Sequence, residues 1–296
     1  MRIVVTGGSG FLLAPLVGRL RTEVQDLVLL TRHPRRPGDL AWNPESPSEA
    51  LATVIDGADA VVHFAGESIA GGRWTERRKA AIRDSRVRLT RALVEAILAA
   101  RKPPTVLVSG SAVGFYGPHG DEVLTEASPP GEDFLAQVCR DWEGEAMAAS
   151  SATRVVTVRT GLALGRWGGA LPQIARPFNW LLGGPVGSGS QYMSWIHRDD
   201  WTQLVYRALM DPSISGPINA TSPTPVTNLE FARTLGRVLR RPARLRMPPS
   251  ALRLVLGEMG DALLLSGQRV IPAKAESLEF TFQYPQLEPA LRAIFH

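Results

Sequence analysis

The first thirteen residues place a buried strand directly before a glycine-rich turn and a helix. Residues 3–6 are apolar and β-branched, as in a strand that is covered on both faces. Gly7 suits the dihedral angles of a tight turn, and Gly10 lets backbone N–H groups approach an anion at the positive end of the following helix. This order predicts a site for the pyrophosphate of a dinucleotide. The alternative is an ordinary strand-to-helix connection that contains glycines.

The second apolar strand, residues 27–30, ends in Thr31 and Arg32. These two residues follow the glycines by about twenty positions, where such folds contact the adenosine ribose. A carboxylate there would bind both ribose hydroxyls of NAD, whereas a guanidinium binds a 2′-phosphate through paired charged hydrogen bonds. The residues that follow are also basic: His33, Arg35 and Arg36. Arg32 therefore predicts NADP(H), with a solvated basic loop as the alternative.

Composition limits the class of protein. The chain has 296 residues, of which 44% are hydrophobic and 21% charged, which suits one α/β domain with a smaller lobe. The first strand begins at residue 2 and no apolar run reaches about 18 residues, so we expect no signal peptide, no membrane span and a cytoplasmic location. Cys139 is the single cysteine, and the five histidines form no close ligand pair, so we expect no disulfide framework and no metal site.

The formal net charge of +5 raises the possibility of nucleic-acid binding. The basic residues are scattered, however, and those between residues 73 and 91 have the spacing of a solvated helix face. No recognisable nucleic-acid module accompanies them. We therefore expect a small-molecule substrate rather than a nucleic acid, and a monomer or a homodimer.

Strands and helices alternate to about residue 165. The expected strands after the first two cover residues 59–63, 106–109 and 154–159, and the long helices cover 74–100 and 134–149. This alternation predicts a Rossmann-type α/β fold with a doubly wound parallel sheet. We assign residues 1–165 to the dinucleotide-binding domain and residues 166–296 to a smaller substrate lobe. Parts of 195–240 are expected to complete the sheet.

Several segments together resemble a known superfamily. They are residues 6–11, 64–67, 109–112, 115–117, 159–161, 195–200 and 267–272. In this order the chain resembles the extended short-chain dehydrogenase/reductase superfamily. More narrowly, it is similar to the atypical NAD-dependent epimerase/dehydratase-like group, whose members carry Gly-Gly-Pro-x-Gly-Ser-Gly and a short C-terminal domain of unassigned role.

The resemblance implies a cofactor site with contributions from several strand ends. The implied positions are Gly7, Gly10, Phe11 and Leu12 for the pyrophosphate; Thr31 and Arg32 for the ribose phosphate; Phe64, Ala65 and Gly66 for the ribose and the backbone near the nicotinamide; Arg86 for a phosphate or a ribose; and Ala163 for the nicotinamide. The resemblance also places His197 and Asp200 behind the site, as a helix cap or a buried hydrogen-bond link.

The usual catalytic pair of this superfamily is missing. Typical members use a tyrosine whose pKa is lowered by a lysine four residues later. The tyrosines here are at positions 116, 192, 206 and 284, and none is followed by lysine at that spacing. In the helix where the pair belongs, the aligned residues are Phe134 with Val138 or Leu135 with Cys139.

Two hydroxyl groups remain as candidates for catalysis. Ser111 follows the strand that faces the cofactor and is expected to bind the substrate, unless it caps local backbone. Tyr116 is a candidate proton donor, unless it serves packing. The sequence thus predicts an NADP(H)-dependent oxidoreductase or epimerase that acts on an unknown carbonyl or alcohol, with Tyr116 or a substrate-bound water as the proton donor. The alternative is a non-catalytic NADP(H)-binding sensor or scaffold.

Overall fold

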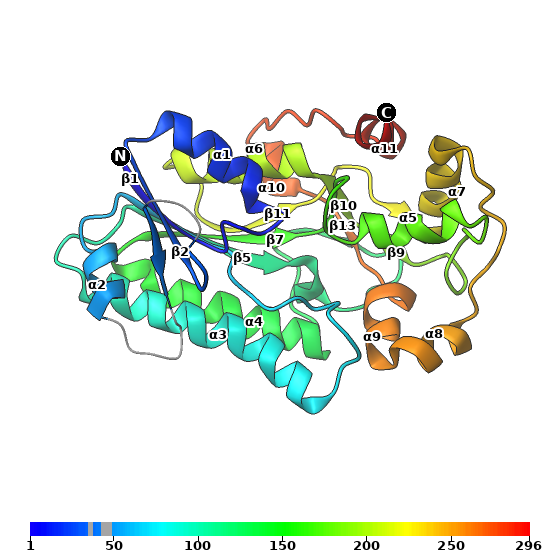
Figure 1. Cartoon of the computed structure of the whole chain (residues 1–296), viewed down its shortest axis with the longest axis horizontal. Coiled ribbons are helices and arrows are strands. Elements are labelled where there is room, and N and C mark those ends of the chain that lie inside the picture. Colours follow the sequence, from blue (N-terminus) through cyan, green and yellow to red (C-terminus); the bar gives the residue numbers. More distant parts are fainter. Residues whose placement is uncertain (35–37, 43–48) are drawn as a thin grey trace.

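The computed structural model describes residues 1–34, 38–42 and 49–296 and is built on one large parallel sheet. Its seven strands have the order β11-β7-β5-β4-β1-β2-β3 (Figure 1). Their bounds are β1 Arg2–Thr6, β2 Asp26–Thr31, β3 Asp39–Ala41, β4 Ala60–His63, β5 Val106–Ala112, β7 Arg154–Thr160 and β11 Gly216–Ala220. All neighbouring pairs are parallel, and the order reverses on either side of β1. The predicted doubly wound α/β fold is confirmed.

Helices cover both faces of this sheet. The helices α1 (Leu13–Glu23) and α6 (Arg198–Met210) lie on one face, and α2 (Glu49–Ile55), α3 (Glu76–Ala99) and α4 (Phe134–Met147) lie on the other (Figure 1). The alternation of side chains along β1 explains the two cores. Ile3 and Val5 pack toward α1 and α6, whereas Val4 packs toward α2 and α3.

Polar side chains define where the long helices begin. Thr75 accepts a hydrogen bond from the Arg78 backbone at the start of α3, and Asp133 accepts one from the Ala136 backbone at the start of α4. These N-caps satisfy backbone donors that a helix leaves unpaired. The two helices therefore start close to the expected residues 74 and 134.

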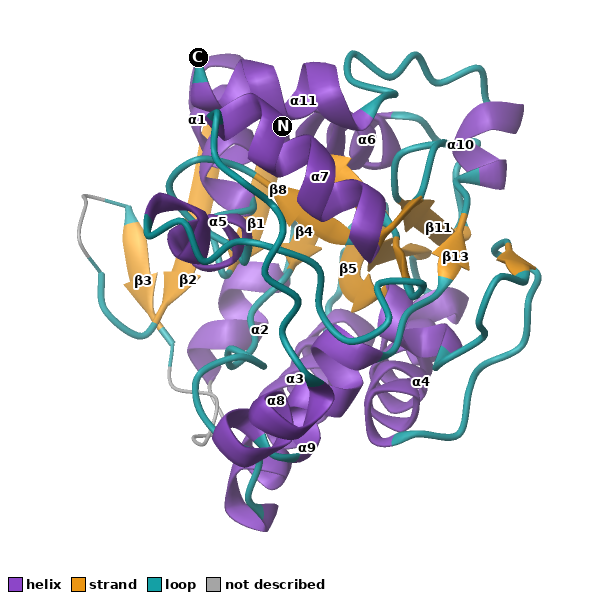
Figure 2. Cartoon of the chain, turned by 90° about the vertical axis from the view of Figure 1, so that its right-hand side faces the viewer, coloured by secondary structure: helices purple, strands orange, loops and turns teal. Residues whose placement is uncertain are grey.

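The smaller lobe has a core of its own. It contains α5 (Leu171–Asn179), α7 (Asn228–Leu239), α8 (Pro249–Leu256), α9 (Glu258–Gly260) and α11 (Leu287–Phe295) (Figure 2). Three short two-stranded sheets connect it to the rest: β8 (Leu162–Leu164) with β10 (Trp195–His197), β9 (Tyr192–Met193) with β12 (Val226–Thr227), and β6 (Val123–Leu124) with β13 (Arg269–Val270). The chain also returns to the large sheet through β11, so lobe and sheet are interleaved in sequence.

Within the described ranges, no helix combines the length and the apolar character that crossing a membrane requires. The same ranges hold no group of three or more His, Cys, Asp and Glu side chains that is suited to a metal ion.

Candidate cofactor and active site

The glycine-rich turn between β1 and α1 presents free backbone donors. Gly7 has a φ of 76°, and a Cβ atom there would lie 2.8 Å from the carbonyl carbon of Phe64, so only glycine fits. Gly10 donates to the Gly7 carbonyl over 2.9 Å, and Ala14 donates to the Gly10 carbonyl over 3.0 Å. Among the described residues, the N–H groups of Phe11 and Leu12 have no backbone or side-chain acceptor. Two unpaired donors at a helix N-terminus are suited to an anion.

The Phe11 side chain joins this turn to the loop that leads into the lobe. Its ring lies so close to residues 165–169 that a Cβ atom at Gly165 would approach the ring to 2.6 Å and one at Gly168 to 2.5 Å. The Arg198 guanidinium lies over the ring, 5.3 Å from its centroid. The Phe11 backbone therefore faces the expected cofactor site, and its ring packs against residues 165–169, which lead into the lobe.

The end of β2 carries a cation that pairs with no other described residue. The Thr31 hydroxyl accepts a hydrogen bond from the His33 backbone over 3.3 Å. Arg32 is exposed and makes no ion pair or hydrogen bond with another residue of the described chain. Arg35 and Arg36, which also suggested a phosphate site, lie outside the described residues. The guanidinium of Arg32 is thus available for an anionic ligand.

A buried histidine links the ends of strands β1 and β4 to helix α3. His63 Nδ1 lies 2.6 Å from the Thr6 hydroxyl, and its Nε2 lies 2.9 Å from the Thr90 hydroxyl. Burial lowers the pKa of His63 to about 4, so the ring is neutral near pH 7. This link fixes the two strand ends from which the glycine turn and the following loop, residues 64–66, start.

That loop, together with Ala163, forms the remaining part of the expected cofactor site. The Phe64 ring points away into the core and meets Trp201 edge-on, with centroids 5.1 Å apart, so that Phe64 offers only its backbone. Gly66 lies on Arg86, because a Cβ atom at Gly66 would be 3.2 Å from the guanidinium carbon. Ala163 is half-buried on β8, opposite Ile196 of β10.

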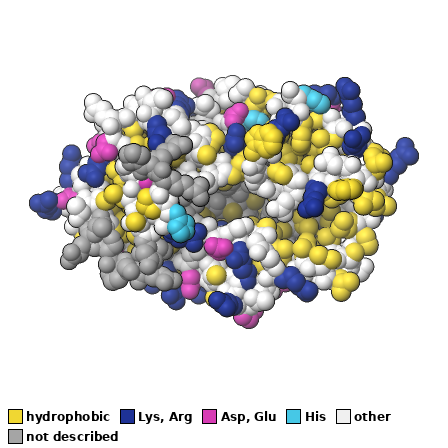
Figure 3. All heavy atoms as spheres, in the orientation of Figure 1, with side chains coloured by type: hydrophobic (Ala, Val, Ile, Leu, Met, Phe, Trp, Pro, Cys, Tyr) yellow, Lys and Arg dark blue, Asp and Glu magenta, His cyan; other side chains and the backbone are white. Residues whose placement is uncertain are grey.

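The surface view agrees with an open site between sheet and lobe. Figure 3 shows a hollow near the middle of the molecule and a concentration of hydrophobic side chains to its right, on the lobe. The most exposed large hydrophobic residues of the lobe are Trp167, Trp180, Leu181, Leu182, Leu254 and Val255. By contrast, Trp195 of β10 is completely buried.

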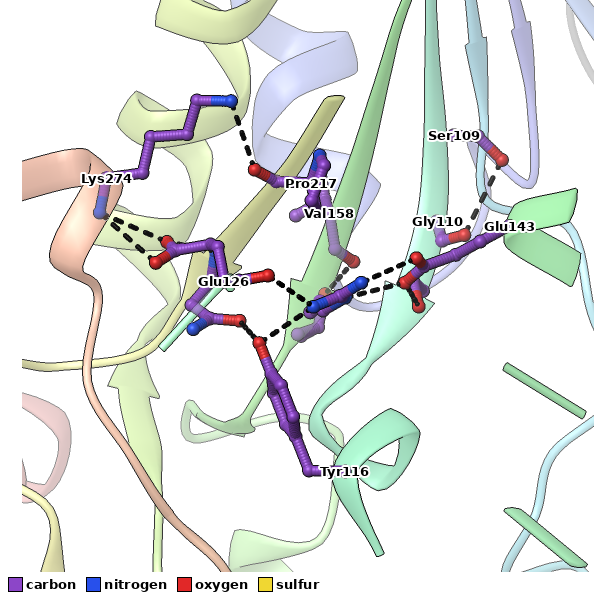
Figure 4. Close-up of polar contacts among 12 residues, drawn as sticks. Ser109, Gly110, Tyr116, Glu126, Glu143, Val158, Pro217 and Lys274 are labelled. Carbon is purple, nitrogen blue, oxygen red and sulfur yellow. Dashed lines mark hydrogen bonds and ion pairs between the residues drawn. The ribbon is translucent and has the colours of Figure 1, made fainter. Parts of the chain in front are cut away.

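The candidate Ser111 is already engaged. Its hydroxyl donates to Glu143 Oε1 over 2.6 Å, and only 5% of the residue is exposed. Arg159 holds the same carboxylate with two hydrogen bonds, from Nε to Oε1 over 2.8 Å and from Nη2 to Oε2 over 2.9 Å (Figure 4). The Ser111 hydroxyl thus supports a buried ion pair, and its contact with a substrate stays a prediction.

Tyr116 is enclosed in the same way. Its hydroxyl donates to Asn219 Oδ1 over 2.6 Å and accepts from Arg159 Nη1 over 2.9 Å, and the residue is 0% exposed (Figure 4). Burial raises the pKa of Tyr116 above its ordinary value. In this geometry the phenol is enclosed between Asn219 and Arg159, and the catalytic role of Tyr116 stays a prediction.

The network extends to the end of the chain through Glu126. Its carboxylate accepts from the Asn219 backbone over 2.9 Å and from the Lys274 backbone over 3.2 Å. Asn219 Nδ2 in turn donates to the Ile271 carbonyl over 3.0 Å. These bonds join residues 271–274 to Glu126 and to Asn219 of β11. Sequence analysis missed Glu126, Glu143 and Asn219, since no spacing rule connects residues that meet only in the folded sheet.

The other expected supporting residues behave as predicted. His197 caps α6 by accepting from the Asp199 backbone over 3.2 Å. The Asp200 carboxylate accepts from the backbones of Gln283 and Tyr284 over 2.7 and 2.9 Å. Cys139 is buried, and burial raises the pKa of its thiol to about 12, as for a small residue of the core.

Comparison with known proteins identifies the family of this chain. The model of the NAD dependent epimerase/dehydratase family matches residues 3–219. The chain belongs to this family. A second model, described as a domain of unknown function, matches residues 247–294 of this epimerase-family protein. The predicted resemblance, including the C-terminal domain without an assigned role, is confirmed.

Relatives of this epimerase-family protein cover nearly its whole length. The chloroplastic epimerase family protein SDR39U1 homolog of Arabidopsis thaliana is 42% identical over 302 residues, which cover 99% of this chain and 86% of the relative. Human epimerase family protein SDR39U1 is 36% identical over 297 residues, 99% of either chain. The crystal structure of the human protein (isoform 2) with NADPH superposes with a TM-score of 0.92 at 35% identity and covers 99% of both chains.

Proposed function

We propose that this protein binds NADP(H) across the ends of β1, β2 and β4 and acts as an oxidoreductase or epimerase on a carbonyl or alcohol. One observation carries the proposal. Two N–H groups at the N-terminus of α1 and the guanidinium of Arg32, none of which has a partner among the described residues, lie at the two strand ends where this fold binds pyrophosphate and ribose. Backbone donors match the pyrophosphate, and the guanidinium matches a 2′-phosphate. The NADPH in the structure of the human relative supports the same choice.

The proposed roles follow from the groups that each residue presents. Gly7, Gly10, Phe11 and Leu12 form the pyrophosphate turn, Thr31 and Arg32 hold the ribose phosphate, Phe64, Ala65 and Gly66 line the ribose and nicotinamide, and Ala163 faces the nicotinamide. Arg86, whose side chain lies beneath Gly66 of this loop, is the proposed partner of a cofactor phosphate or ribose. When bound, the nicotinamide would supply hydride chemistry, and the protein would supply position and exclusion of water.

We propose that the proton comes from a substrate-bound water. The Ser111 and Tyr116 hydroxyls already donate to Glu143 and Asn219, and both residues are buried. A buried donor that must break a charged network before it reacts is a poor general acid. A water bound with the substrate in the hollow beside the lobe can donate a proton without breaking this network.

The second candidate function is a non-catalytic NADP(H)-binding sensor. The enclosed network around Arg159 favours it, since Glu143, the buried acid of α4, is held by Arg159 with two hydrogen bonds. A screen of aldehydes, ketones and alcohols, followed by nicotinamide absorbance, separates the two functions. Turnover of any compound supports the enzyme, and binding of NADPH without turnover supports the sensor.

A fluorescence titration with NADPH and NADH tests the cofactor assignment. NADPH is expected to bind at least about tenfold more tightly than NADH, about 1.4 kcal/mol, and Arg32→Ala should remove that difference. Arg140→Ala, another exposed arginine, serves as the matched control and should keep it. Equal affinities in the unsubstituted protein would contradict the assignment to NADP(H), and no binding of either nucleotide would contradict the cofactor site as a whole.

A further inference from the structure

Two segments of the smaller lobe carry positive charge and no negative charge. Residues 166–182 and 240–257 contain seven arginines and no aspartate, glutamate or lysine. Among the described residues, only Arg253 of these seven pairs with a carboxylate, that of Asp261 over 2.8 Å. Arg176 on α5 and Arg241 and Arg244 before α8 are exposed. These guanidinium groups are therefore available to an anionic partner.

The same two segments expose large apolar side chains. At the end of α5, Trp180 is 71% exposed, and Leu181 and Leu182 are 59% and 56% exposed. At the end of α8, Leu254 and Val255 are 78% and 65% exposed. Figure 3 shows hydrophobic side chains concentrated on this side of the molecule, over the elements that Figure 1 labels α5 and α8. An exposed apolar surface of this kind marks an interaction site.

Backbone hydrogen bonds place the two segments side by side. The Leu245 backbone donates to the Gly183 carbonyl over 3.1 Å, and the Met247 backbone donates to the Pro185 carbonyl over 2.9 Å. Leu245 and Met247 are themselves 55% and 38% exposed, so they extend the apolar surface from the end of α5 toward α8. We call residues 180–182, 245, 247, 254 and 255 together the apolar patch.

The arginines beside the apolar patch select the kind of partner. Two copies of this chain that met through the patch would bring their arginines together, and like charges at close range oppose association. Single-stranded nucleic acid matches the charge, but its bases bind by stacking on aromatic rings, whereas most of the patch is aliphatic. An anionic phospholipid surface matches both features, because its headgroups are negative and its interface accepts tryptophan and leucine side chains.

We propose that the apolar patch docks this protein onto an anionic phospholipid surface. Trp180, Leu182 and Leu254 enter the boundary between headgroups and acyl chains, and Arg241 and Arg244 bind lipid phosphates. Docking of this kind is peripheral and uses no membrane-spanning helix. The patch adjoins the hollow between sheet and lobe, so the docked protein holds this hollow close to the lipid (Figure 3). The docking needs no nucleotide, and its test is independent of the proposed function.

Vesicle flotation tests the proposal on the whole chain without nucleotide. The vesicles consist of phosphatidylcholine alone or of equal parts of phosphatidylcholine and phosphatidylglycerol, and each is used at low and at high NaCl concentration. The apolar variant combines Trp180→Ser with Leu254→Ser. The charge variant combines Arg241→Ser with Arg244→Ser. All four side chains are exposed, and thermal unfolding establishes that each variant is folded.

Two matched controls replace exposed residues of the same types outside the patch. Leu98→Ser on α3 removes an exposed leucine, and Arg140→Ser on α4 removes an exposed arginine. Both helices cover the large sheet rather than the lobe (Figure 1). A loss of vesicle binding that is confined to the patch variants therefore reports on the patch and not on the overall charge or hydrophobicity.

We expect the unsubstituted protein to bind the anionic vesicles at least about tenfold more tightly than the phosphatidylcholine vesicles. High salt should weaken this binding, because it screens the attraction between arginines and headgroups. The apolar variant and the charge variant should each lose at least about tenfold in affinity for the anionic vesicles. The two controls should bind as the unsubstituted protein does.

Three results would overturn the inference. The first is no binding of the unsubstituted protein to the anionic vesicles. The second is full binding by the apolar variant together with loss in the charge variant, which would indicate attraction to any polyanion. The third is a dimer in sedimentation velocity that the apolar variant loses, without vesicle binding, which would show that the patch joins two copies of the chain.

Discussion

Two neighbouring regions at the same edge of the sheet differ in how they use polar groups. At the ends of β1 and β2, the N–H groups of Phe11 and Leu12 and the Arg32 guanidinium have no partner in the described chain. At the ends of β5, β7 and β11, Ser111, Glu143, Arg159 and Tyr116 satisfy one another (Figure 4). Donors without a partner can bind a ligand, whereas donors that are paired within the protein stabilise the fold.

This difference bears on the end of β5, where the family resemblance placed the candidate catalytic hydroxyls. The strand end that carries catalytic hydroxyls in typical short-chain dehydrogenases here holds a buried ion pair. Such a pair adds little net stability compared with apolar packing, but the removal of one partner is costly. We call the paired network at the ends of β5, β7 and β11 the closed region, and the ends of β1 and β2 the open region. Substitutions in the closed region should mainly lower the free energy of unfolding, and substitutions in the open region should mainly lower the affinity for the cofactor.

The largest effect is expected from Arg159→Met. The substitution leaves the Glu143 carboxylate buried without its cation, and the free energy of unfolding should fall by about 3 to 5 kcal/mol. Urea unfolding measures this loss. In the double variant Arg159→Met with Glu143→Met most of the stability should return. A loss below about 1 kcal/mol in the single variant would show that the ion pair is open to water.

Acid should weaken the link made by His63. Its pKa is about 4 in the folded protein and about 6.5 when unfolded, so the unfolded chain takes up a proton first as the pH falls. The stabilisation is complete above about pH 6.5 and is lost as the pH decreases toward 4, by about 3 kcal/mol in total. Unfolding free energies of the protein and of His63→Gln across this range measure the difference. Equal pH dependence of the two proteins would contradict the prediction.

Tyr116→Phe separates a structural phenol from a catalytic one. The substitution removes the donor to Asn219 and the acceptor of Arg159, and we expect a loss of about 2 kcal/mol in unfolding free energy. NADPH affinity should stay within about twofold, measured by fluorescence titration. If the variant is as stable as the unsubstituted protein and loses turnover of a substrate found in the screen, Tyr116 acts in catalysis after all.

The smallest effect on stability is expected in the open region. Arg32→Ala should change the unfolding free energy by less than about 0.5 kcal/mol, because the side chain is exposed and unpaired within the described chain. Urea unfolding in the absence of nucleotide is the measurement. A larger decrease in the unfolding free energy would mean that the Arg32 side chain pairs with another group of the protein in solution. The difference between the two regions would then be smaller than the structure indicates.

Local pattern was sufficient to predict the open region. The strand, turn and helix around Gly7 lie within a short stretch of chain, and the observed bounds of β4 and β5 differ from the expected ones by a few residues. The sheet was predictable because buried parallel strands appear as apolar runs between helices.

The closed region could not be predicted in the same way. Arg159 and Glu143 are separated by 16 residues and lie on different elements, and Asn219 meets Tyr116 across 103 residues. Ser111 and Tyr116 were placed at the correct strand end, but their hydrogen-bond partners depend on tertiary packing.

The contacts of Glu126 with Lys274 bridge 148 residues, and this distance along the chain has a consequence for folding. A ribosome releases β5, β7 and α4 long before residues 271–274, so the growing chain contains these elements before the segment that completes their polar network. Contacts of such large sequence separation form slowly, and an intermediate with an incomplete network is prone to aggregation. Residues 271–274, which lie in the domain without an assigned role, can therefore make their contacts with Glu126 and Asn219 only after the rest of the network has been synthesised.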